Sequence, residues 1–133
     1  MNSASTIKRI LAMNSLAVVG FSPKQERPSH FVSMYLISCG YKITPVNPGH
    51  HEIAGMKCFP HLLSISVSID VAIIFRKSKF VPDIVNDAIL IGAKAIWMQD
   101  GIRNKVSCKL AKDRGLKVIM DDCILRQHQK LKN

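Results

Sequence analysis

The stretch from residue 16 to residue 30 constrains the fold more than any other part of the chain. It begins with Leu16–Val19, a short apolar run rich in β-branched residues, and the run stops at Gly20. A polar loop follows, and an amphipathic helical pattern starts at Pro28. Such a run is typical of a strand buried on both faces, and proline suits the first turn of a helix. The stretch is therefore predicted to form a strand, a loop and a helix.

The loop between this strand and this helix carries Ser22, Lys24 and Arg27. Backbone N–H groups and the positive end of the helix dipole attract anions at the start of a helix. Two cationic side chains and a hydroxyl group beside them add to that attraction. The loop is therefore predicted to hold a phosphate-bearing nucleotide.

Strand-like and helix-like segments alternate along the rest of the chain. Further strands are predicted at 43–46, 71–75, 95–98 and 118–120, and helices at 1–13, 28–39, 82–92, 104–115 and after residue 122. Three of the strands follow the same junction, a helix-ending glycine, one spacer and a lysine, at Gly40, Gly92 and Gly115. Because right-handed crossovers join successive parallel strands, we expect a Rossmann-like, doubly wound three-layer α/β/α fold with a five-stranded parallel sheet.

Single residues predict the caps of two helices and the apolar side of one. Ser3 or Ser5 is predicted to cap the first helix, and Asn104 is predicted to cap the fourth. The fourth helix is expected to carry Val106 on its apolar side, together with Leu110 and Ala111. Residues 50–55 are predicted to form a loop with little regular structure, and residues 60–65 one or two turns of helix.

Length and composition indicate a single domain over 1–133, with a helix over 1–13 and a frayed tail over 129–133. Apolar runs stay well below the roughly 18 residues of a membrane span, and the N-terminus lacks the order of a signal peptide. A cytoplasmic location without membrane contact is therefore expected. The four cysteines contain no Cys-x-x-Cys pair and are interpreted as core thiols rather than as metal ligands.

The net charge of +10, from 19 basic and 9 acidic residues, favours an anionic partner. No run of five like charges is present, so nucleic acid is an unlikely partner. A protein partner and homo-oligomerisation remain open.

Ligands of doubly wound sheets bind beyond the carboxyl ends of the strands. The loop after the first strand is not a Gly-x-Gly-x-x-Gly fingerprint, and the second strand ends in Val46-Asn47-Pro48 without the carboxylate that would bind a ribose. NAD is therefore disfavoured, and the absence of a Walker lysine loop argues against an ATPase.

Five motifs at these strand ends together resemble the small stand-alone CoA-binding proteins of bacteria. They are Gly-Phe-Ser-Pro-Lys-Gln-Glu-Arg-Pro-Ser-His at 20–30, Pro-Val-Asn-Pro at 45–48, Phe-Arg-Lys-Ser at 75–78, Trp-Met-Gln-x-Gly at 97–101 and Met-Asp-x-Cys at 120–123. The loop at 20–25 is also similar to the Gly-Phe-Thr-x-Lys-Gln loop that cradles CoA phosphates in the succinyl-CoA synthetase α-subunit. The resemblance covers about residues 4–128 and implies a ligand that is coenzyme A or an acyl-CoA.

The resemblance implies roles for residues of every motif. Ser22, Lys24 and Gln25 would hold the pyrophosphate, Arg27 the 3′-phosphate, and Trp97, Gln99 and Gly101 would lie near the pantetheine arm. Asp100 stands where an apolar or small residue is expected. The full set of predicted ligand-binding residues is Gly20, Phe21, Ser22, Lys24, Gln25, Arg27, Val46, Asn47, Pro48, Phe75, Arg76, Ser78, Gln99 and Gly101. In this set, Val46, Asn47 and Pro48 would border the adenosine, and Phe75, Arg76 and Ser78 would cover its other side.

The sequence assigns no catalytic group. Asp121 or Asp122 is interpreted as a cap of the last helix, and Cys123 as a buried thiol, with a mixed disulfide to CoA as the alternative. Three functions therefore stay open. They are a CoA or acyl-CoA binding module without catalysis of its own, an enzyme that uses NADP or another nucleotide, and a regulatory protein that acts through a basic C-terminal face. This face is expected from residues 103–133, which contain nine basic and three acidic residues.

Overall fold

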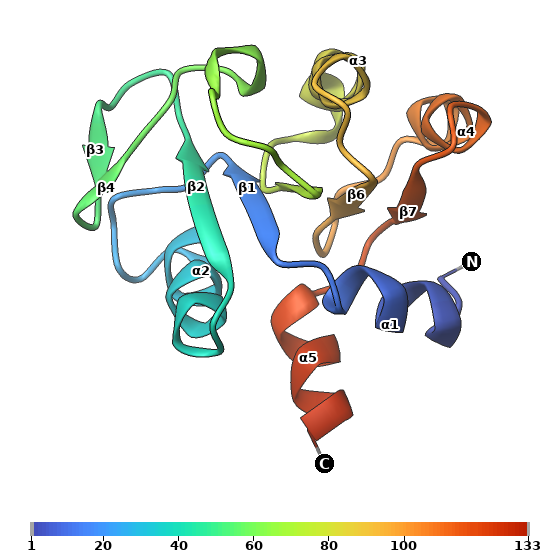
Figure 1. The fold of residues 1–133 in the computed structure, drawn as a ribbon, viewed down its shortest axis with the longest axis horizontal. Helices are drawn as coiled ribbons and strands as arrows, with labels where there is room; N and C mark the ends of the chain where they lie inside the picture. Colours follow the sequence, from blue (N-terminus) through green and yellow to red (C-terminus); the bar gives the residue numbers. More distant parts are fainter. Residues whose placement is uncertain (1, 133) are drawn as a thin grey trace.

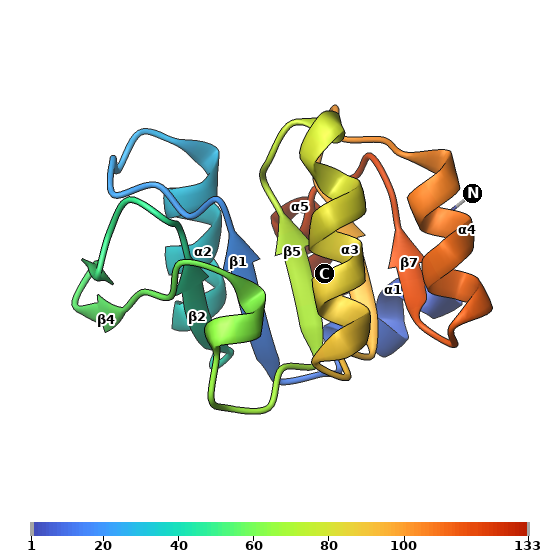
Figure 2. The same cartoon turned by 90° about the horizontal axis from the view of Figure 1, so that it is seen from above.

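The computed structural model describes residues 2–132 and contains a five-stranded parallel sheet between two layers of helices (Figures 1 and 2). The strand order is β2-β1-β5-β6-β7, and every neighbouring pair is parallel. The strands are β1 (Ser15–Val19), β2 (Lys42–Val46), β5 (Val71–Ile74), β6 (Ala95–Met98) and β7 (Lys117–Ile119). The predicted Rossmann-like fold with a five-stranded parallel sheet is confirmed.

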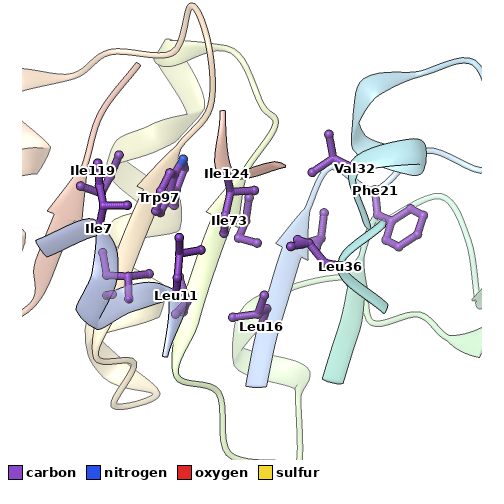
Figure 3. Close-up of a cluster of buried hydrophobic side chains, with 14 of the residues drawn as sticks. Ile7, Leu11, Leu16, Phe21, Val32, Leu36, Ile73, Trp97, Ile119 and Ile124 are labelled. Atoms are coloured by element: carbon purple, nitrogen blue, oxygen red, sulfur yellow. The ribbon is translucent and has the colours of Figure 1, made fainter. Parts of the chain in front are cut away.

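Five helices cover the two faces of this sheet. Three of them, α1 (Ala4–Leu11), α2 (Pro28–Ser38) and α5 (Ile124–Lys132), cover one face, and α3 (Val81–Leu90) and α4 (Lys105–Asp113) cover the other (Figure 1). Successive strand residues point to opposite faces, so Trp97 packs beneath the first group while its neighbours Ile96 and Met98 pack beneath the second. Figure 3 shows the core under α1, α2 and α5. The strands are continuously apolar because both faces of the sheet are covered.

A small hairpin interrupts the region between β2 and β5. Its strands are β3 (Glu52–Ile53) and β4 (Met56–Lys57), joined by Ala54 and Gly55, which both have positive φ angles of 52° and 77°. Two positive φ angles are typical of a type I′ hairpin turn. The prediction of an irregular loop was therefore wrong here, because two-residue strands carry no periodicity and alanine is an uncommon residue at this turn position. Short 3₁₀ turns, η1 (Leu62–Ser64) and η2 (Ser78–Phe80), complete the connections.

The caps of two helices follow from local chemistry. The Oγ of Ser3 accepts a hydrogen bond from the backbone N–H of Thr6, so Ser3 rather than Ser5 caps α1. Asn104 caps α4 as predicted, by accepting from the N–H of Ser107.

Two predicted details of the helices differ in the structure. Val106 is 82% exposed, because the buried side of α4 is centred on Ser107 and Ala111 instead. The last helix continues to Lys132, through residues for which a frayed tail was predicted, while residue 133 lies outside the described residues. Within residues 2–132 we find no helix of sufficient length and apolarity to span a membrane.

Candidate functional site

A cleft of about 780 Å³ opens at the carboxyl ends of the strands. It lies beside the boundary between β1 and β5, where the order of the strands reverses, and its size is in the range of roughly 300–1,000 Å³ that is typical of ligand sites. Its lining combines the loop after β1, the first turn of α2 and the residues that follow the other strands. These residues are Gly20, Ser22, Pro23, Lys24, Arg27, Pro28, Ser29, Phe31, Val32, Asn47, His50, Phe75, Gln99, Asp100, Ile102 and Cys123.

Hydrogen bonds hold the loop between β1 and α2 in a defined shape. The Oγ of Ser29 accepts from the N–H of Ser22 at 2.9 Å, and the Oγ of Ser22 accepts from the N–H of Lys24 at 3.1 Å. The buried ring of His30 bonds to the carbonyl of Ser22 at 2.8 Å. Because a carbonyl oxygen only accepts, Nδ1 of His30 carries the proton. The first turn of α2 therefore braces the loop before any ligand arrives.

Asn47 joins this loop to the end of β2. Its Nδ2 donates to the carbonyl of Phe21 at 3.0 Å, and its Oδ1 accepts from the N–H of Gly49 at 3.0 Å. Both functional groups of the amide are thus used to connect two loops that are far apart in sequence. This tie gives Asn47 a positioning role at the wall of the cleft.

Gly20 brings the loop close to the end of β5. Its φ angle is +92°, and a Cβ atom there would lie 3.0 Å from Cδ of Arg76 and 3.3 Å from the carbonyl group of Phe75. A side chain at this position therefore meets both an unfavourable backbone conformation and a crowded neighbour.

Gly20→Ala is expected to lower the free energy of unfolding by at least about 1–2 kcal/mol, the cost of a left-handed conformation. Chemical denaturation checks this value. Gly49→Ala is the matched control, because its Cβ would meet only Oδ1 of Asn47 at an ordinary 3.6 Å. Equal losses in the two variants would show that the conformation of Gly20 is not the cause.

The mouth of the cleft is positively charged. Lys24 and Arg27 line it at the start of α2, and neither takes part in an ion pair within residues 2–132. Arg27 occupies the capping position of α2, where no side chain satisfies the first N–H groups. Two free cations and a helix N-terminus together form an anion-binding arrangement.

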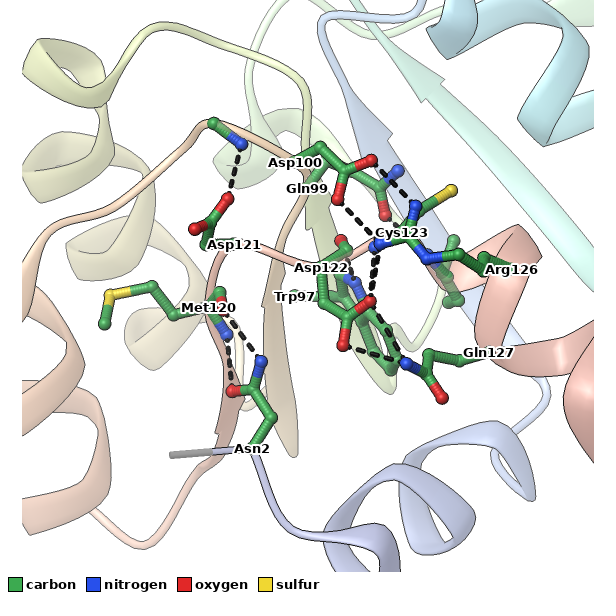
Figure 4. A network of polar contacts seen from close by, with 12 residues as sticks. Asn2, Trp97, Gln99, Asp100, Met120, Asp121, Asp122, Cys123, Arg126 and Gln127 are labelled. Carbon is green, nitrogen blue, oxygen red and sulfur yellow. Dashed lines mark hydrogen bonds and ion pairs between the residues drawn. The ribbon is translucent and has the colours of Figure 1, made fainter.

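The acidic residue in the lining, Asp100, is neutralised by the last helix. Arg126 donates to its two carboxylate oxygens at 2.8 and 3.1 Å and to Oδ1 of Asp122 at 2.9 Å (Figure 4). The hydrogen bond from the Arg126 guanidinium holds the pKa of Asp100 below its usual range. An acidic residue therefore stands where an apolar or small one was expected, but its negative charge is paired with Arg126.

The structure divides the predicted ligand-binding residues into three groups. Those that line the cleft are Gly20, Ser22, Lys24, Arg27, Asn47, Phe75 and Gln99. A second hollow of about 240 Å³ is lined by Val46, Pro48 and Arg76, together with residues such as Phe80. The remaining ones, Phe21, Gln25, Ser78 and Gly101, line neither space.

Each residue of the third group except Gln25 has another contact in the structure. The side chain of Phe21 is fully buried in the core, and the Oγ of Ser78 accepts from the N–H of Arg103 at 3.1 Å. The N–H of Gly101 donates to Oδ1 of Asp121 at 2.6 Å. Trp97, the suggested neighbour of pantetheine, is also fully buried, and its indole N–H donates to the carbonyl of Asp122.

Other lining residues were not predicted from the sequence. Ser29, Phe31 and Val32 lie on the first turns of α2, and the position of that helix after the predicted phosphate-binding loop was an available signal. His50 and Ile102 come from loops whose paths depend on packing, so no local pattern indicated them. Asp100 and Cys123 directly follow predicted strands, where site residues are expected, but neither belongs to the predicted set of ligand-binding residues.

Comparisons with known proteins identify the family of this chain. Residues 14–129 match the family model described as CoA binding domain. The chain belongs to this family. It is 37% identical over 127 residues to the uncharacterized protein YneT of Bacillus subtilis, with 95% of this chain and 94% of that protein covered. A solved structure, a hypothetical protein from Pyrococcus horikoshii, is 37% identical with a TM-score of 0.94, covering 99% of this chain and 94% of that one.

The chain is also similar to part of some much longer proteins. The ADP-forming acetate–CoA ligase of Methanocaldococcus jannaschii is 27% identical over 127 residues, but the match covers 89% of this chain and only 18% of the ligase. This CoA-binding domain chain is therefore similar to one part of the ligase, whereas it is similar to YneT over nearly the full length of both. The predicted family resemblance is confirmed.

Proposed function

We propose that this chain binds coenzyme A or an acyl-CoA in the cleft, with the loop after β1 as the phosphate site. The observation that carries the proposal is the pair of unpaired cations, Lys24 and Arg27, beside the first turn of α2 in a ligand-sized cleft. Family membership supports the same ligand class. The proposal concerns binding and assigns no catalytic group.

The phosphates of CoA are assigned to the positive mouth. Lys24 and the hydroxyl of Ser22 bind the pyrophosphate together with the N–H groups of α2, and Arg27 binds the 3′-phosphate. Charge-assisted hydrogen bonds of this kind are the stronger ones in proteins. Gln25 lines neither space, so it is a weaker candidate for the pyrophosphate than the sequence suggested.

The adenine is assigned to the second hollow. It lies at the other side of the β1 carboxyl end and offers the apolar ring of Pro48 and the guanidinium of Arg76, which stacks on Phe80 at 4.2 Å. A planar guanidinium held in this way is a suitable surface for an aromatic base. Val46 closes the floor of this hollow.

Thermal denaturation in the presence of CoA, dephospho-CoA, acetyl-CoA, NADP and ATP tests the proposal. A ligand at 100 times its dissociation constant stabilises the native state by about 2.7 kcal/mol. Dephospho-CoA is expected to bind about one to two powers of ten more weakly than CoA, because one charge-assisted contact contributes roughly 1.5–3 kcal/mol.

The ligand series also separates the other two functions. A thermal shift with NADP but none with CoA would contradict the proposal and favour a nucleotide-dependent enzyme. Equal affinity for CoA and dephospho-CoA would remove Arg27 from its assigned role. A salt-sensitive interaction with RNA or DNA, without any effect of CoA on stability, would favour a regulatory protein that acts through its basic C-terminal face.

A further inference from the structure

The outward side of α2 is apolar and lies at the surface of the molecule. Phe31 and Met34 are 49% and 40% exposed, although the opposite side of the helix already packs Val32 and Leu36 into the core. Phe31, Met34 and the exposed Ser38 are spaced i, i+3 and i+7, so they share one stripe, which we call the outer stripe of α2. A helix that is apolar on both sides is normally covered on both sides.

The place of α2 in the fold explains why the outer stripe faces solvent. The helix packs on the edge strand β2, and α5 lies against it on the side toward the middle of the sheet and separates it from α1 (Figure 1). α2 is therefore the last helix of its layer. Its inner side is used by the core, and its outer stripe is available to another molecule.

The charge of the surface distinguishes the outer stripe from other exposed apolar side chains. Among the five α-helices of residues 2–132, α2 is the one without a lysine, arginine, aspartate or glutamate. Elsewhere, Val106 directly follows Lys105 on α4, and Leu90 lines a small hollow together with Arg114. An acidic protein or a nucleic acid is attracted by cations, which the outer stripe lacks. The partner that fits this stripe is therefore uncharged where it makes contact.

We infer that the outer stripe of α2 is a contact surface between two copies of this chain. Two chains that each carry a net charge of +10 repel each other, so they approach most easily through a surface without cations. A second copy offers the same uncharged stripe, and a two-fold axis pairs the helices antiparallel with Met34 facing its counterpart. The small Ser38 then lies opposite Phe31 of the second copy, and each positive helix end lies beside a negative one.

The contact is expected to be weak and reversible. α2 has 11 residues and is therefore about 16 Å long, so a pair of such helices forms an interface at the low end of the usual sizes, below roughly 1,200 Å². Salt screens the repulsion between the two chains and should strengthen the contact. Contact with an acidic partner would weaken with salt instead. The inference does not depend on the proposed ligand, and Met34 lies outside the lining of the cleft.

Sedimentation equilibrium over a range of protein concentrations, with reductant present, tests the inference. The wild type is expected to show a reversible monomer–dimer equilibrium that is stronger at about 0.5 M salt than at about 0.05 M. Met34→Lys should raise the dissociation constant at least about tenfold, because the two-fold axis brings the two new cations together. Met34 is partly exposed, so this variant is expected to fold, and circular dichroism checks that it does.

Two variants with the same added charge are the controls. Leu90→Lys and Leu63→Lys replace apolar side chains that are 74% and 54% exposed and lie outside the outer stripe. Both should keep the dissociation constant of the wild type within about twofold, since a single distant charge is largely screened. A larger loss of dimer in either control than in Met34→Lys would overturn the inference. A monomer at every concentration, or a dimer that weakens as salt is added, would also overturn it.

A cysteine cross-link locates the contact independently. Under mild oxidation, Met34→Cys is expected to give a covalent dimer linked through residue 34, as peptide mapping by mass spectrometry would show. Val106→Cys is the matched control, because that position is 82% exposed and lies on α4, so it should give no more covalent dimer than the wild type. Equal yields from the two variants would contradict an antiparallel pair of α2 helices.

Discussion

The double variant Lys24→Ala/Arg27→Ala is expected to lose about two to four powers of ten in CoA affinity. Each side chain is assigned a charge-assisted contact worth roughly 1.5–3 kcal/mol, and the two losses add when the contacts involve different phosphates. Isothermal titration calorimetry at moderate salt measures the change. Neither side chain takes part in an ion pair within residues 2–132, so the stability of the unliganded protein should stay close to that of the wild type.

A second double variant controls for the net charge of the protein. Lys112→Ala/Arg114→Ala removes the same charge from α4 and the residue after it, outside the lining of the cleft. Long-range attraction would weaken equally in the two double variants, whereas local contacts are lost only in the first. Similar affinities for the two variants would contradict the assignment of the phosphate site.

The single variant Arg27→Ala sharpens the same experiment. It is expected to bind CoA and dephospho-CoA with nearly equal affinity, because its assigned partner is the phosphate that distinguishes them. Lys24→Ala should weaken both ligands by a similar factor and keep their ratio. The reverse pattern would exchange the roles of the two cations while leaving the phosphate site in the same loop.

Trp97→Ala is expected to lower the free energy of unfolding by about 3–5 kcal/mol, the usual cost of truncating a large buried aromatic side chain. Trp97 is fully buried in the core under α1, α2 and α5. Its indole N–H also bonds to the carbonyl of Asp122 at 2.9 Å, so the truncation leaves that carbonyl without this partner. Chemical denaturation followed by circular dichroism gives the value, since the variant removes the one tryptophan that would report by fluorescence.

Val106→Ala is the comparison for this experiment. Val106 is 82% exposed, so its truncation is expected to change the free energy of unfolding by no more than about 0.5 kcal/mol. A loss of less than about 1 kcal/mol in Trp97→Ala would contradict the assignment of Trp97 to the core. It would reopen the suggestion from the sequence that this ring lies against pantetheine.

Local chemistry in the sequence determined most of the helices and strands, and the position of the loop between β1 and α2. The strand at Ala95–Met98 was predicted with the bounds that it has in the structure, and the cap at Asn104 was predicted correctly. Both features depend only on residues that are close in sequence. The strand is a short apolar run, and the cap is an asparagine side chain three residues before the backbone N–H that it accepts from. The hairpin of β3 and β4 was missed for the same reason, because its strands are too short to form a pattern.

Only the tertiary structure decided which side chains meet at the cleft. Asp100 and Arg126 are 26 residues apart and belong to elements that the sheet order brings together, so no local pattern paired their charges. The same order places Gln99 beside Cys123 in the lining of the cleft and Trp97 in the core beneath it. The sequence by itself determined the strand–loop–helix unit and its positive charge, because both are local. The lining of the cleft required the crossovers between strands, because contacts between distant segments arise only when those segments pack on one sheet.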